Sequence, residues 1–136
     1  MAIKTEQQIE RDFFTMVKSS ALGKAIRGTV YRPEMRPANA KTEDIIVKFF
    51  AGLDSQVQSG VILLNIYVPD IAYKDGRKVE DMSRIGELEE LCLSFVNDNT
   101  NTEYRMETDG SPSSMLNEEI EQHLIYCRIK FNRITF

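Results

Sequence analysis

The segment from His123 to Phe136 restricts the fold more than any other, because its side chains alternate along its length. Successive side chains of a β-strand point to opposite faces of the sheet. One face carries His123, Ile125, Cys127, Ile129 and Phe131, and the other carries Leu124, Tyr126, Arg128, Lys130 and Asn132. The pattern is typical of an antiparallel sheet that is buried on one face. We therefore predict a long antiparallel strand here.

Two apolar runs earlier in the chain are predicted to be strands as well. Asp44 to Ala51 is rich in Ile, Val and Phe, and Val61 to Val68 is a second run of this kind. The polar, glycine-bounded segment from Gly52 to Gly60 joins them, so together they predict a β-hairpin with a long loop. Shorter strands are expected at residues 29–32 and 104–107.

Two segments have the apolar spacing of amphipathic helices. The first runs from about Glu6 to Ser19 and opens with a capping box formed by Thr5 and Gln8. The second runs from about Asp81 to Val96, after an Asp–Gly turn. Their apolar stripes are Ile9, Phe13, Met16 and Val17 in the first, and Ile85, Leu88, Cys92, Phe95 and Val96 in the second. The chain is thus predicted to be one α+β domain over residues 1–136, with a mixed, mainly antiparallel sheet and two main helices packed on it.

Length and composition fit this single domain. The chain has 136 residues, 42% of them hydrophobic and 28% charged, and a domain near this size buries enough surface to fold without disulfides. Two cysteines are too few for a secreted disulfide framework. The first residues do not form an apolar signal peptide, and the apolar runs are too short to cross a membrane. These features predict a protein of a reducing cytosol with no membrane partner.

No group of residues predicts catalysis, a cofactor or a metal site. The one histidine, His123, lies near Glu118, Glu119 and Glu121 but has no nucleophile or activating motif beside it. Cys92 and Cys127 fall on apolar faces, where free cysteines act as small hydrophobic side chains. The acidic segment from Asp70 to Asp81 lacks carboxylates at calcium-loop spacing. We therefore expect that the protein is not an enzyme.

Charge is distributed unevenly, although the net charge is only −4. The stretch from Lys18 to Lys41 holds six basic residues and one acidic residue, whereas the stretch from Glu80 to Glu121 holds twelve acidic and two basic residues. These stretches are either two solvated faces or complementary surfaces for a head-to-tail contact between copies. Nucleic acid is not expected as a specific ligand, because aromatic residues are not interleaved with the basic ones.

The order of elements and several local strings resemble a family of phage tail-completion proteins, which includes tail terminators and head–tail joining proteins of long-tailed phages. The resemblance rests on the first helix, the strand at Val30-Tyr31-Arg32, the proline-marked stretch from Arg32 to Pro37, the hairpin strands, the helix from Ile85 to Val96 and the closing segment from Glu118 to Phe131. It implies a homo-oligomeric ring, expected to be hexameric, that terminates the tail tube and joins it to the head connector. It also implies a bacterial cytoplasmic location during assembly, then the virion tail, and no cofactor.

The resemblance further implies which surfaces make contacts. Family members place loops at the ring lumen and at the tube, which assigns this role to Leu53, Asp54, Ser55, Gln56, Val57, Gln58 and Ser59, with Asp70 to Lys78 as the second choice. A closed ring needs two different, complementary patches. We accordingly predict that three cations face three carboxylates of a neighbouring copy: Arg27, Arg32 and Arg36 against Glu87, Glu89 and Glu90.

Three other functions stay open on the sequence. The first alternative is a non-catalytic module of bacterial or phage origin that binds a peptide or protein at a sheet edge or groove. A small enzyme would need a concave pocket with converging polar groups. Nucleic-acid contact through residues 18–41 would depend steeply on salt.

Overall fold

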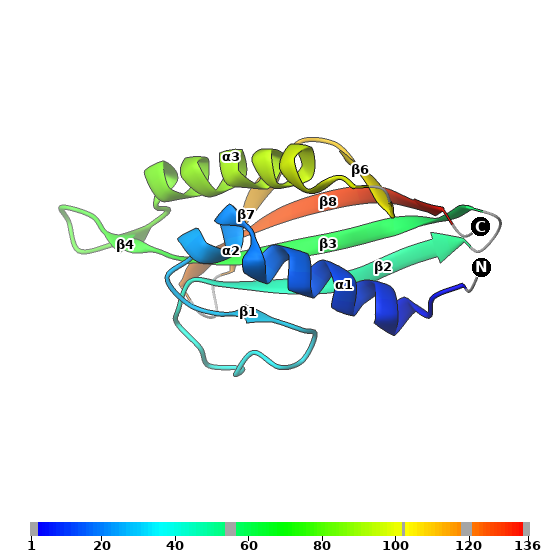
Figure 1. Cartoon of the computed structure of the whole chain (residues 1–136). Helices are drawn as coiled ribbons and strands as arrows, with labels where there is room; N and C mark the ends of the chain where they lie inside the picture. The colour runs from blue at the N-terminus through cyan, green and yellow to red at the C-terminus, as the bar shows by residue number, and fades with distance from the viewer. Residues whose placement is uncertain (1–2, 54–56, 102, 118–120, 135–136) are drawn as a thin grey trace.

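The computed structural model describes residues 3–53, 57–101, 103–117 and 121–134, and the fold has two layers (Figure 1). One layer is a sheet, and the other is formed by helices that lie on a single face of that sheet. The predicted α+β class with a mixed, mostly antiparallel sheet is confirmed. In chain order the elements are α1 (Glu6–Ser19), α2 (Ala21–Ala25), β1 (Val30–Tyr31), β2 (Asp44–Leu53), β3 (Val57–Pro69), β4 (Ile71–Ala72), β5 (Lys78–Val79), α3 (Met82–Asn99), β6 (Tyr104–Thr108), β7 (Ser113–Asn117) and β8 (Gln122–Ile134).

The main sheet has the strand order β1-β2-β3-β8-β6, and β7 pairs with β8 beyond the end of β6. Strand β1 runs parallel to β2, and the other pairs are antiparallel. The centre is the ladder between β3 and β8, which pairs continuously from Val57 with Ile134 to Pro69 with Gln122. A β-bulge at Phe50 interrupts the register between β2 and β3, and bulges of this kind increase the local twist.

The core lies between the sheet and the helices, and it contains the predicted stripes. All five apolar positions of the α3 stripe are buried, as are Ile9, Phe13 and Val17 of α1. The inward face of β8 contributes Ile125, Cys127, Ile129 and Phe131, as the alternation predicted. The rings of Phe13, Tyr104 and Phe131 meet with centroids 4.9 to 5.9 Å apart, which joins α1, β6 and β8.

Helix boundaries agree closely with the sequence patterns because local groups define them. Helix α1 begins at Glu6 behind the predicted capping box, in which Thr5 accepts from the Gln8 backbone and the Gln8 side chain accepts from the Thr5 backbone. Asp81 is the N-cap of α3, and its side chain accepts a hydrogen bond from the backbone N–H of Arg84. The α3 helix continues to Asn99, one turn past the predicted end.

Two expectations about the strands were wrong, and one strand was missed. The long hairpin loop from Gly52 to Gly60 is mostly strand, because Gly52 pairs with Gly60 and Leu53 with Ser59. The segment after Pro69 contains a second small sheet, formed by β4 and β5, in place of a simple turn. Strand β7 was not predicted, since its sequence, Ser-Ser-Met-Leu-Asn, alternates too briefly to indicate a strand.

Candidate functional site: an uncovered sheet face and a projecting hairpin

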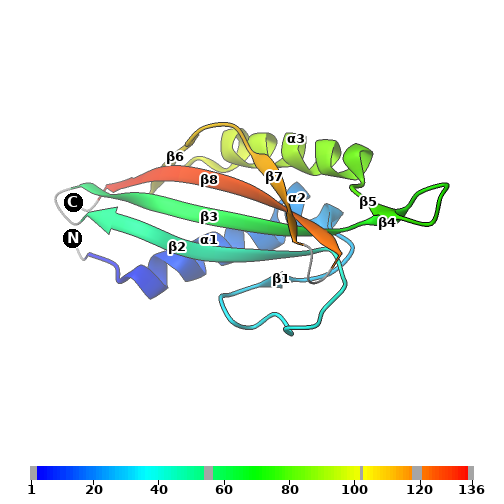
Figure 2. The same cartoon turned by 180° about the vertical axis from the view of Figure 1, so that it is seen from behind.

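One face of the main sheet carries none of the described helices, and Figure 2 shows β2, β3 and β8 in front of the helical layer. The side chains on this face are those that alternate with the core positions. They include Ile46, Lys48 and Phe50 of β2, Val61, Leu63, Asn65 and Tyr67 of β3, and Tyr126, Arg128, Lys130 and Asn132 of β8. We call this surface the open face. Half-buried apolar side chains on a helix-free sheet form a surface that a protein partner can cover.

Pairing register aligns the side chains of the open face in rows across the strands. Lys48, Leu63 and Arg128 occupy one row, and Ile46, Asn65 and Tyr126 occupy the next. The Arg128 guanidinium lies 5.4 Å from the centre of the Phe50 ring, whose side chain is exposed. Arg128 also pairs with Asp109 at 3.2 Å. The face therefore combines apolar area with charges that are already partly neutralised.

Asn65 is the one side chain of this face whose polar group is buried without a partner among the described residues. Its Oδ1 atom is inaccessible to solvent and accepts no hydrogen bond there. An unpaired buried acceptor costs roughly 1–3 kcal/mol. The centre of the open face therefore carries a buried polar atom without a hydrogen-bond partner among the described residues. The pairing register places Asn65 between Ile46 of β2 and Tyr126 of β8.

A depression of about 670 Å³ lies at the end of the open face next to β6. Its charged side chains are Arg105, Glu107 and Lys130, and the remaining lining residues are Gly52, Ser59, Gly60, Val61, Met106, Phe131 and Asn132. The pairing of β6 with β8 sets Lys130 directly opposite Glu107. Among the described lining residues there is no histidine or cysteine.

The predicted interface cation Arg36 is bound within its own chain, which corrects the prediction for this residue. Its Nε atom lies 2.8 Å from Asp44 Oδ2, and the two side chains are only 6% and 1% exposed. The guanidinium lies 3.8 Å over the ring of Tyr67 and donates to the Thr42 carbonyl oxygen and to Gln122 Oε1. Burial acts to raise the pKa of Asp44, but hydrogen bonds from Thr42, Thr29 and Arg36 outweigh it and lower that pKa.

The other two predicted cations differ from one another. Arg32 pairs with Glu10 at 2.8 Å, and Glu10 also accepts a hydrogen bond from the backbone of Phe49. Arg27 is exposed, and no ion pair to it is seen in the described part of the chain. Its backbone N–H donates to Glu43 Oε1, which places the start of the 27–43 segment against a buried pair of Glu43 with Arg84.

The three predicted carboxylates lie on α3 and also differ. Glu87 pairs with Arg84 at 3.1 Å. Glu89 is half-buried, and burial together with the nearby Glu80 raises its pKa. Glu90 is exposed and has no ion pair within the ranges that the structure describes. Glu87 and Glu90 therefore remain on the surface of α3, while Glu89 is turned towards its own chain.

The segment predicted to face the lumen or the tube divides into three parts. Leu53 and Val57 belong to strands, and Asp54, Ser55 and Gln56 lie outside the described residues. Gln58 is 2% exposed, so its predicted lumen-facing role is wrong. Its side-chain amide exchanges two hydrogen bonds with the backbone of Lys4 and accepts another from Arg133. Ser59 lines the depression on the open face.

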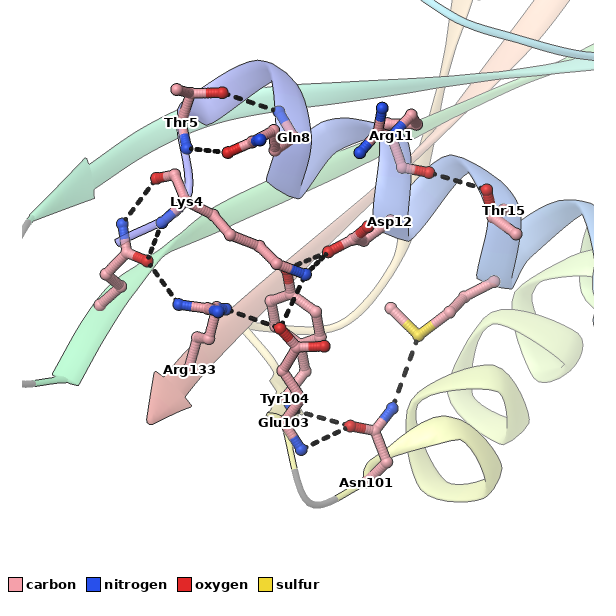
Figure 3. A network of polar contacts seen from close by, with 12 residues as sticks. Lys4, Thr5, Gln8, Arg11, Asp12, Thr15, Asn101, Glu103, Tyr104 and Arg133 are labelled. Atoms are coloured by element: carbon pink, nitrogen blue, oxygen red, sulfur yellow. Dashed lines mark hydrogen bonds and ion pairs between the residues drawn. The ribbon is translucent and has the colours of Figure 1, made fainter. Parts of the chain in front are cut away.

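The Gln58 contacts belong to a polar network that fixes the N-terminal segment to the end of β8 (Figure 3). Lys4 pairs with Asp12 at 2.6 Å and with Glu103 at 2.8 Å, and Arg133 pairs with Glu103 at 2.8 Å. The Tyr104 hydroxyl donates to Asp12 at 2.7 Å. Burial and this hydrogen bond raise the pKa of Tyr104 far above its usual value. A tyrosine held in its neutral form by a structural carboxylate is not placed to act as a base.

His123 is part of an anchor at the base of a projecting hairpin. Its Nδ1 atom lies 2.6 Å from Asp70 Oδ1, and its Nε2 atom lies 3.4 Å from Glu80 Oε2. Among the described residues, the carboxylates that contact it come from residues 70 and 80. They approach different ring nitrogens, and so they do not converge on one metal position. Among the described residues no group of three or more His, Cys, Asp or Glu side chains could hold a metal.

The hairpin between these two carboxylates, formed by β4, the turn and β5, extends beyond the end of the sheet in both views. We call residues 71–79 the arm. Tyr73 and Arg77 close its turn with a backbone hydrogen bond of 2.8 Å, and Gly76 has a φ of +86°, a conformation that glycine adopts without strain. Ile71 and Tyr73 are 46% and 50% exposed. The Asp75-Gly76 pair between short apolar stretches is a hairpin signal that could have identified the arm from the sequence.

The two cysteines lie in contact at the centre of the core, where α3 packs on β8. Both are free and buried, as their apolar positions predicted. Interaction with Cys92 lowers the pKa of Cys127, whereas the same interaction and burial raise the pKa of Cys92. A buried thiol with a raised pKa is a poor nucleophile.

Comparison with known proteins does not assign a family to this chain. It matches no model of a known protein family and none of the curated proteins. None of the described helices is both long enough and apolar enough to cross a membrane.

Proposed function

We propose that this chain is a structural phage, or prophage, tail-completion protein. It would form a ring, expected to have six copies, that terminates the tail tube and joins it to the head. The observation that carries the proposal is the combination of a helix-free open face with an arm that leaves the body of the domain. Subunits of a closed ring need two different surfaces, because each copy uses one of them towards each neighbour.

The polar clusters support a structural role over a catalytic one. The ions of the Arg36, Arg84 and Lys4 clusters pair with carboxylates of the same chain. Such clusters fix the ends of the strands and the inter-element segments in one arrangement. A stiff subunit loses less conformational entropy when it joins a ring, so this construction favours assembly. Partners of the ring would be the tail-tube and head-connector proteins, first in the bacterial cytoplasm and then in the virion tail.

The test is the mass of the purified chain in solution over a range of concentrations and salt, followed by negative-stain microscopy of the largest species. We expect a discrete ring at high concentration that weakens as salt rises, because surface charges are screened beyond roughly 8 Å at physiological ionic strength. A strict monomer under all conditions would count against self-assembly and favour the second candidate function.

The second candidate is a non-catalytic module that binds a peptide or protein at the edge of the sheet. In the described part of the chain, strand β1 pairs with β2 at Ile45 and Ile46. Further along β2, the Glu10 carboxylate accepts a hydrogen bond from the backbone N–H of Phe49. A groove of about 790 Å³ runs along this edge and is lined in part by Phe14, Tyr31 and Met35. An extended peptide can add to an edge of this kind. This function predicts a monomer that binds without forming rings.

A further inference from the structure

We infer that the arm docks on the outward face of α3 of a second copy of this chain, and that this contact closes the ring. The inference rests on the proposed function and names the surfaces that would carry it. It replaces the cations predicted from the sequence, two of which are bound within their own chain.

The first argument is the way in which the arm is built. Its two ends are fixed to His123 of β8 through Asp70 and Glu80, and the Asp70 side chain is only 4% exposed. Between these fixed ends, the residues from Ile71 to Lys78 are exposed, including the apolar side chains of Ile71 and Tyr73. A hairpin of two strands has little stability of its own in water. A firmly anchored hairpin with uncovered apolar side chains is suited to a contact outside its own chain.

The second argument is the charge of the arm. Arg77 pairs with Asp75 inside the turn at 2.6 Å. Lys74 and Lys78 are exposed, and neither has an ion pair in the parts of the chain that are described. Two cations of the open face differ, because Arg128 and Lys130 both approach Asp109. The arm thus presents two unneutralised positive charges, of which Lys78, paired with Ala72, lies on the face opposite that of Ile71.

The third argument is the matching surface on α3. The outward side of this helix carries the exposed residues Glu87, Glu90 and Asp98, and it also carries Leu93, which is 42% exposed. The carboxylates of this helix are opposite in charge to the lysines of the arm, and Leu93 offers an apolar contact for an exposed apolar side chain of the arm. The arm points away from the body in both views, so its tip does not lie on α3 of its own chain. If α3 is the acceptor, it therefore belongs to another copy.

The expected strength follows from the size of the arm. A specific interface commonly buries about 1,600 Å² in total, and a hairpin tip on one helix face covers less than a whole interface of that kind. A single contact is then weak, while closure of a ring engages every arm at once and raises the overall affinity. Assembly should depend steeply on concentration and weaken with salt.

The experiment exchanges the charges of the two surfaces. The arm variant is Lys74→Glu with Lys78→Glu, and the acceptor variant is Glu90→Lys with Asp98→Lys. Glu87 is left unchanged because it binds Arg84. The matched control is Lys18→Glu with Lys24→Glu, which reverses two exposed lysines at α1 and α2. Circular dichroism verifies the fold of each variant, and sedimentation velocity measures self-association.

We expect each of the two variants to weaken self-association at least tenfold, and we expect the control to assemble like the wild type. A chain that carries all four changes should regain assembly, because its charges are complementary again. If the wild type forms rings and the arm variant assembles equally well, the arm inference is wrong, while the proposed ring function still stands. Loss in both variants without recovery in the combined chain would overturn this particular pairing. A wild type that stays monomeric would overturn self-docking, together with the ring.

Discussion

Replacement of Arg36 by leucine should cause the largest loss of stability of any single change considered for this chain. Its guanidinium is nearly inaccessible, pairs with the equally buried Asp44, and stacks on Tyr67. Removing one partner of a buried ion pair leaves the other charge uncompensated, which costs about 3–5 kcal/mol. Thr42 and the Thr29 backbone would still donate to Asp44, so the lower half of this range is expected.

The magnitude can be converted into a melting temperature. Unfolding entropy near 60 °C is about 2.1 cal/mol/K per residue, and the chain has 136 residues. This gives about 0.29 kcal/mol/K, so a loss of about 3 kcal/mol lowers the midpoint by roughly 10 °C. Urea unfolding followed by circular dichroism measures the free energy directly. A matched control is Arg77→Leu, since the pair of Arg77 with Asp75 is exposed and should contribute no more than about 1 kcal/mol.

The pH dependence provides an independent check on the same pair. The pKa of Asp44 is lowered in the folded state, so the unfolded chain binds a proton at this carboxyl more readily. Its stabilising contribution is therefore fully present above the unfolded pKa of about 3.9 and is lost as the pH falls through the lower, folded value. Arg36→Leu should reduce this acid-dependent part of the stability. Equal losses for Arg36→Leu and Arg77→Leu, or an unchanged acid profile, would refute the reasoning.

Three further predictions concern single side chains. Asn65→Val should raise the free energy of unfolding by about 1 kcal/mol in urea titrations, because it removes an unpaired buried acceptor and adds a residue with high β-propensity; a loss would mean that Oδ1 has a partner. His123→Ala should speed amide hydrogen exchange in residues 71–79 and leave α1 protected, since the anchor of the arm is removed; unchanged exchange would show that the arm is held in another way. Cys92 and Cys127 should not react with Ellman's reagent at pH 8 in the native state, and both should react after denaturation; rapid native labelling would contradict their burial.

Much of the fold could be predicted from the sequence because local patterns determine the longest elements. The boundaries of α1 follow from a capping box and a helical apolar stripe, both of which act within a few residues. The buried face of β8 follows from a period of two. The failure from Gly52 to Gly60 has a physical reason, because polar residues and glycines in that segment join a ladder that β8 extends. Pairing with a distant strand is not encoded in the local composition.

The candidate surfaces were harder to predict, since a charge run does not reveal which charges pair within the chain. Arg36 and Asp44 are eight residues apart, but Gln122 approaches the same guanidinium from the far end of the sequence. Their burial arises from the sheet, which brings β2, β3 and β8 together.

The arm could be recognised in part from the sequence, but its position on the surface could not. Its Asp-Gly turn is visible in the sequence, but its projection depends on an anchor that joins β8 to residues 70 and 80. Lys74 and Lys78 are separated from the basic stretch at 18–41 and carry fewer charges than it does. They are candidates for a contact with a partner because, among the described residues, they stand unpaired on a fixed hairpin, whereas Arg32 and Arg36 of that stretch are paired within their own chain. For an assembly surface, exposure and pairing state therefore carry more information than the number of charges in a segment.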